Sequence, residues 1–164
     1  MFSKEKHLTP KLEDAMSDTW SQVIKSLLEA NDFRFSQFND SHGYTLAFAG
    51  EFTPLNLLVF ATECSSKEET SLSIIGKLPY RIPEDEVPNM LHFLNEKNCE
   101  LVIGNFELHE SKKISYRMGT EIWPDFNAEK LKSLIYLSVT CLDDLDIEIR
   151  EAAKQTPPRF SISF

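Results

Sequence analysis

Hydrophobic residues recur at three- and four-residue intervals in three parts of the chain, which is the spacing of a single apolar helix face. These parts cover residues 10–30, 84–97 and about 127–154. Pro10 can occupy a first helical turn, and Pro88 must lie within the first turn of the second helix. Pro157 and Pro158 end the third stretch. The pattern therefore predicts three helices, the last of them long.

Elsewhere the hydrophobic period falls to two, the spacing of strands whose side chains alternate between two faces. Three strands are predicted between the first two helices, and a hairpin is predicted after the second, at residues 44–48, 55–63, 71–78, 100–108 and 114–122. Phe33, Phe35 and Phe38 indicate a short edge segment, and Gly104 indicates a bulge or a close backbone approach.

The order of these elements defines the fold class. It reads α-β-β-β-α-β-β-α, with links too short for parallel crossovers between consecutive strands. We therefore expect an α+β fold in which helices pack on an antiparallel sheet. The 164 residues suit one domain at 10–154, with a flexible tail at 1–9 and a C-terminal tail at 155–164.

The strand at 55–63 is apolar on both of its faces. One set of its side chains is continuous and is expected to face the helices: Leu55, Leu57, Val59 and Ala61. Leu58 and Phe60 belong to the other face, where Ile75 of the next strand can join them. We predict that Leu58, Phe60 and Ile75 form a protein-interaction patch, because exposed apolar patches require cover. That cover comes either from another chain or from the protein's own second helix.

The net charge of the protein limits the classes of partner that it is expected to bind. Seventeen Lys and Arg residues against 26 Asp and Glu give a net charge of −9. This argues against general binding to nucleic acid or to anionic membranes, and long-range attraction favours basic protein clients.

No apolar run reaches a membrane span of about 18 residues. The N-terminus has no signal-peptide core, and three widely spaced cysteines fit a reducing compartment. We therefore expect a cytoplasmic protein without nucleic-acid or membrane partners.

Candidate catalytic and metal-binding residues are few. None of the four histidines is spaced with a second ligand as in zinc motifs, and the glycine-rich phosphate motifs are absent from the sequence. The acidic group Asp143, Asp144, Asp146 and Glu148 is read as the solvated side of the last helix. We expect no catalytic residues, no cofactor-binding residues and no metal site.

Several short motifs resemble those of the YbjN domain family. They are Leu78-Pro79-Tyr80-Arg81-Ile82-Pro83, Leu94-Asn95, Gly104-Asn105-Phe106-Glu107-Leu108 and Ile114-Ser115-Tyr116-Arg117. The resemblance covers about residues 40–153. The family is described as bacterial sensory transduction regulators with a fold similar to type III secretion chaperones. It implies that fold and a homodimer, and it implies no reaction.

These features together predict a non-enzymatic protein-binding module with a chaperone-like or regulatory role. We expect a homodimer that also binds a protein client through apolar burial and edge-strand pairing. The alternative is a small-molecule sensor or an enzyme with a pocket between the sheet and the long last helix. Buried polar groups lining such a pocket would favour the alternative.

Overall fold

The computed structural model describes residues 12–38, 43–63, 70–122, 126–155 and 158–164, so the predicted tail at 1–9 lies outside the described part. The helices are α1 (Leu12–Ala30), the short η1 (Glu84–Glu86), α2 (Val87–Glu100) and α3 (Ala128–Lys154). The strands are β1 (Phe35–Gln37), β2 (Gly43–Ala49), β3 (Pro54–Glu63), β4 (Thr70–Arg81), β5 (Asn105–Leu108) and β6 (Lys113–Glu121). The predicted α+β class and the order of elements are confirmed.

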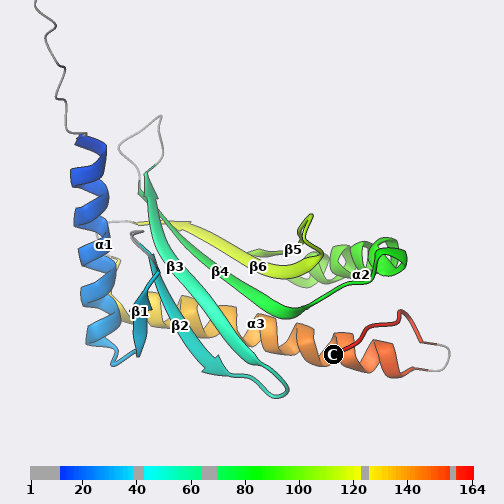
Figure 1. Cartoon of the computed structure of the whole chain (residues 1–164). Helices are drawn as coiled ribbons and strands as arrows, with labels where there is room; N and C mark the ends of the chain where they lie inside the picture. Colours follow the sequence, from blue (N-terminus) through cyan, green and yellow to red (C-terminus); the bar gives the residue numbers. More distant parts are fainter. Residues whose placement is uncertain (1–11, 39–42, 64–69, 123–125, 156–157) are drawn as a thin grey trace, which may run out of the picture.

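The six strands form one antiparallel sheet in the order β1-β2-β3-β4-β6-β5. α3 runs beneath the sheet, and α1 stands beside the end that carries β1 (Figure 1). α2 lies at the opposite end and packs against β5. The three helices α1, α2 and α3 pack with the sheet around the core, and no described helix lies on the opposite sheet face.

Strand alternation separates the core from that second face. Leu55, Leu57 and Val59 are completely buried and belong to the core. α1 contributes Ile24 and Leu28, and α3 contributes a stripe that includes Leu142 and Leu145. The set predicted to face the helices does so, because consecutive strand residues point to opposite sides.

Two element boundaries differ from the prediction. β4 continues beyond its predicted end at Leu78 to Arg81, which pairs with Lys113 of β6. α2 continues to Glu100, so β5 begins only at Asn105. The Asn98 side chain donates to the Phe106 carbonyl at 3.0 Å and accepts from the Phe106 amide at 2.6 Å. These bonds fasten the end of α2 to β5 and explain why the helix reaches so far.

Gly104 precedes β5 and has a φ of +78°, which L side chains rarely adopt. A Cβ at this position would lie 2.4 Å from the Tyr116 hydroxyl oxygen. The Tyr116 hydroxyl itself donates to the Ile103 carbonyl at 2.9 Å. The predicted close backbone approach is confirmed, although it lies before the strand and not within it.

Residues 158–164 return along the domain. Phe160 is 2% exposed, and its ring centre lies 5.4 Å from that of Phe93 on α2. Arg159 pairs with Glu96, and the Ser161 amide donates to the Glu86 carboxylate at 2.8 Å. The segment thus contributes one aromatic side chain to the core and is attached to α2 by polar contacts.

Candidate functional site on the uncovered face of the sheet

Leu58, Phe60 and Ile75 lie together on the sheet face opposite the core. Leu58 of β3 is directly paired with Ile75 of β4, and Phe60 is the next residue of β3 on the same face. All three side chains are half-buried, yet none is part of the core or packs against it. The structure therefore brings the predicted patch residues together on one face.

The protein's own helices pack elsewhere. α1 and α3 contact β3 on the core side, and the buried residues of α2 join the core beside β5. Among the described residues, no helix lies over Leu58, Phe60 and Ile75. Cover by the second helix, one of the two predicted alternatives, is thus not what the described part of the chain shows.

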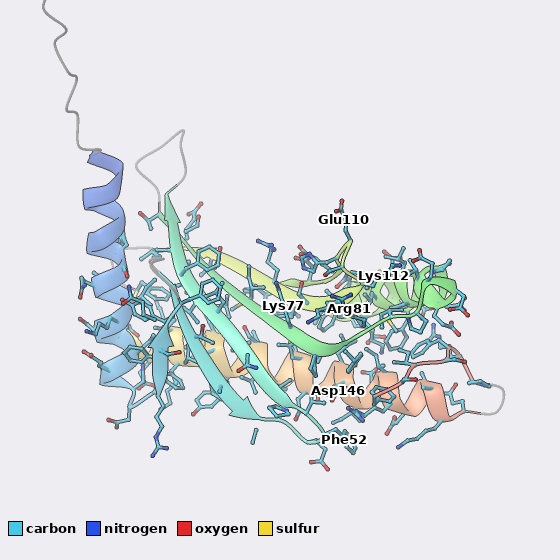
Figure 2. All side chains as sticks on the ribbon, in the orientation of Figure 1. Phe52, Lys77, Arg81, Glu110, Lys112 and Asp146 are labelled. Carbon is cyan, nitrogen blue, oxygen red and sulfur yellow. The ribbon has the colours of Figure 1, made fainter. Side chains whose placement is uncertain are left out.

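Cationic side chains border this apolar patch. Strand alternation places Lys77 and Arg81 of β4 on its face, together with Lys113 and Arg117 of β6. Arg117 is paired directly with Ile75, and Lys113 is paired with Arg81. Figure 2 shows Lys77 on the side of β4 that is away from α3. The face is therefore apolar at one end and basic at the other.

A small polar network joins the basic end at β5. Arg117 Nε lies 3.3 Å from a Glu107 carboxylate oxygen. Glu107 also accepts from the Asn105 side-chain amide at 3.1 Å. His109 Nε2 lies 2.8 Å from the hydroxyl of Ser115, which is buried. The contact with Glu107 orients Arg117, whereas Lys77 and Arg81 are exposed and Lys113 is half-buried.

A second polar cluster lies on the core side and was missed by the sequence reasoning. Asp146 of α3 is completely buried, so the reading of this acidic group as a solvated helix side is wrong for Asp146. Its carboxylate accepts from Thr53 and Tyr80, both at 3.0 Å, and from Arg150 Nε at 3.1 Å. The spacing of four between Asp146 and Arg150 was the available signal.

Aromatic rings cover the Arg150 guanidinium. Its central carbon lies 5.0 Å from the Phe52 ring centre and 4.1 Å from that of Phe164. Burial, with the nearby Asp146 charge, raises the pKa of Tyr80, so its hydroxyl stays protonated and donates to that carboxylate. Because Asp146 is enclosed and hydrogen-bonded on three sides, this cluster holds β4, α3 and the turn before β3 together.

Two hollows bear on the alternative of a ligand pocket. One of about 160 Å³ lies between α2, β5 and α3, and Lys97, Glu148 and Cys141 are among its lining residues. Lys97 is already paired there with Glu148 at 2.6 Å and with Glu100 at 2.9 Å. Burial raises the pKa of the Cys141 thiol, which keeps it protonated and poorly nucleophilic. The other, about 440 Å³, is an open hollow at the start of α3.

Over the described ranges, no three His, Cys, Asp or Glu side chains gather in a way that could hold a metal ion. In the same part of the chain, none of the helices has the length and apolar character needed to cross a membrane.

Comparison with known proteins finds a matching family model and a similar solved structure. A family model named YbjN, with the description "Putative bacterial sensory transduction regulator", matches residues 21–151. Among solved structures, the chain is similar to "Crystal structure of YbjN, a putative transcription regulator from E. coli", with a TM-score of 0.57 and 9% sequence identity. The match covers 80% of this chain and 91% of that one. At this identity the likeness concerns the fold alone. No curated protein matches the sequence.

Proposed function

The chain belongs to the YbjN family, and from this membership we propose that it is a non-enzymatic regulatory protein that acts by binding another protein. The family description supports the regulatory role. The binding surface we propose is the patch of Leu58, Phe60 and Ile75. We place the protein in the cytoplasm, a location supported by its free thiols at Cys99 and Cys141.

One observation carries this proposal: three large apolar side chains lie side by side on a sheet face that no described helix covers. Full burial of each such side chain is worth about 1.5–3 kcal/mol. Association costs about 4–15 kcal/mol in lost freedom, so the patch needs additional contacts to bind well. A partner that also contacts the rest of the face would supply them.

The test is a variant with Leu58→Ser and Phe60→Ser. We expect it to stay folded and to lose its partner in copurification from a bacterial host, followed by mass spectrometry. Light scattering on the same samples reports whether the homodimer implied by the family resemblance forms and whether it depends on this patch. A matched control carries Leu91→Ser and Val102→Ser, two exposed apolar residues away from the sheet face. Equal partner recovery and equal mass in both variants would refute the proposed surface.

The ligand-pocket alternative has less support. In the smaller hollow Lys97 is paired with Glu100 and Glu148, and the larger hollow is open and lined partly by exposed charged residues. Neither presents a buried polar group that awaits a ligand among the described residues.

A further inference from the structure

Four cationic side chains gather on the uncovered face, although the chain as a whole carries −9. Lys77, Arg81, Lys113 and Arg117 lie on adjacent strands β4 and β6, on the face that carries Ile75. Carboxylates on this face are Glu107, which engages Arg117, and Glu121 at the far end of β6; Figure 2 also shows Glu110 of the hairpin on this side of the sheet. The local charge is thus opposite in sign to the mean charge.

Three of these cations have no counterion in the described structure. Lys77, Arg81 and Lys113 make no ion pair with any described residue, whereas Arg117 pairs with Glu107. Neighbouring like charges repel one another, and a partner that brings carboxylates relieves this repulsion and gains attraction. The face therefore selects against basic partners, which the net charge alone would favour.

We propose that the partner at this face is an acidic, amphipathic protein segment; this rests on the proposed binding function and specifies its ligand. Its apolar side chains pack on Leu58, Phe60 and Ile75. Its Asp or Glu side chains pair with Lys77, next to the apolar patch, and farther along the face with Arg81 and Lys113. Adjacent strands are about 4.8 Å apart and same-face residues about 7 Å apart. One turn of an amphipathic helix, about 5.4 Å, brings an apolar and an acidic side chain to these neighbouring positions.

Other occupants fit less well. A twofold dimer through this face would place the cations of both copies in one interface with few carboxylates to balance them, which like-charge repulsion opposes. Nucleic acid offers phosphates to the cations but few apolar groups to pack on Leu58 and Ile75. An acidic amphipathic segment offers apolar side chains to the patch of Leu58, Phe60 and Ile75 and carboxylates to the cationic side chains.

The experiment measures binding of synthetic fluorescent peptides by anisotropy. Each peptide is about 18 residues, or roughly five helical turns. The first combines a leucine face with flanking glutamates. The second replaces glutamate by lysine, and the third replaces leucine by serine. We expect only the first to bind, and its affinity should fall as salt screens the charges. An equally charged single-stranded DNA serves as the competitor.

Two triple variants separate the face from general charge effects. The test variant carries Lys77→Gln, Arg81→Gln and Lys113→Gln, which removes three cations that have no described ion pair. The control carries Lys25→Gln, Lys132→Gln and Lys154→Gln, which changes the net charge equally at α1 and α3, away from the face. We expect the test variant to bind the acidic peptide at least about ten-fold more weakly, with the control unchanged.

The outcomes distinguish this inference from the function on which it rests. If the lysine peptide binds instead and the Leu58→Ser, Phe60→Ser variant loses it, the binding function stands and the acidic partner is refuted. If no peptide binds while that variant changes only the mass in solution, the occupant is a second copy. Tighter binding of the DNA also overturns the inference. If no peptide binds and the Leu58→Ser, Phe60→Ser variant has the same mass in solution as the native protein, both the acidic partner and the proposed binding surface are refuted.

Discussion

At the scale of single residues, Asp146 has the largest predicted effect on stability. Its buried carboxylate accepts hydrogen bonds from Thr53, Tyr80 and Arg150, which come from three separate parts of the chain. We expect Asp146→Ala to lower the free energy of unfolding by about 3–5 kcal/mol, because it leaves the largely buried Arg150 without its counterion. Urea denaturation measures this.

Tyr80→Phe is the matched comparison for Asp146. It removes one donor to the same carboxylate and keeps the ring, which packs on Phe164 with centres 5.1 Å apart. We expect a smaller loss, about 1.5–3 kcal/mol, as for one hydrogen bond to a charged group. If Asp146→Ala costs no more than Tyr80→Phe, the carboxylate does not organise the cluster.

The role of a single residue could be predicted from the sequence where it depends on the local backbone. Gly104 was predicted from its position in an apolar segment, and the positive φ and the nearby Tyr116 ring explain it. Asp146 was missed because helical periodicity assigns charged residues to the solvent side. Its partners Thr53 and Tyr80 are distant in sequence, so only the folded structure reveals that the carboxylate is buried and paired.

At the scale of elements, the C-terminal segment is attached to η1 and α2 by two carboxylates with lowered pKa values. Hydrogen bonds from Asn89 and the Ser161 amide lower the pKa of Glu86, and Arg159 lowers that of Glu96. A lowered pKa in the folded state means that the stabilisation is present above the ordinary value of about 4.5 and is lost as the pH falls through the folded value.

We therefore expect the Ser161 amide resonance to titrate with a midpoint below pH 4.5, measured by NMR. The titration should report the loss of the hydrogen bond to Glu86 while Phe160 stays in the core. The variant Glu86→Ala is the control, because it removes the acceptor and should abolish the titration. A midpoint at or above 4.5 in the native protein would show that this contact does not form in solution.

Element boundaries were predicted well where periodicity was uninterrupted, as in β3, and less well at proline and asparagine. The motif around Pro79 reads as the end of a strand, yet Pro79 is exposed on β4 between Leu78 and Tyr80, which face the core side. The irregular pairing between Lys77 and Arg81 accommodates the proline, which lacks an amide donor. The end of α2 depends on contacts between Asn98 and Phe106 that no local pattern encodes.

At the scale of the whole molecule, the sequence predicted that β3 is apolar on both faces and which face meets the helices, but left open what covers the other face. The basic end of the face was also missed, because its residues come from two strands that are separated by α2 and β5 in sequence. Only the placement of β4 beside β6 unites Lys77, Arg81, Lys113 and Arg117. Strand order, which depends on long-range contacts, was therefore the missing information.

The arrangement of the three helices predicts that the two faces of β3 differ sharply in their tolerance of polar residues. Leu58→Ser with Phe60→Ser changes the uncovered face, so we expect native circular dichroism and only a small change in the melting temperature. Leu57→Ser with Val59→Ser changes completely buried residues of the same strand. Truncation of each such side chain costs about 2–5 kcal/mol, and the buried hydroxyls add to it.

The second pair should therefore unfold the domain, whose total stability is about 5–15 kcal/mol. Each pair lies in the central part of the same strand, so differences in strand propensity or sequence position are small. Thermal melts followed by circular dichroism compare the two variants directly. Unfolding by both pairs would mean that another part of the chain covers Leu58 and Phe60, and the uncovered face would then not be available to a partner.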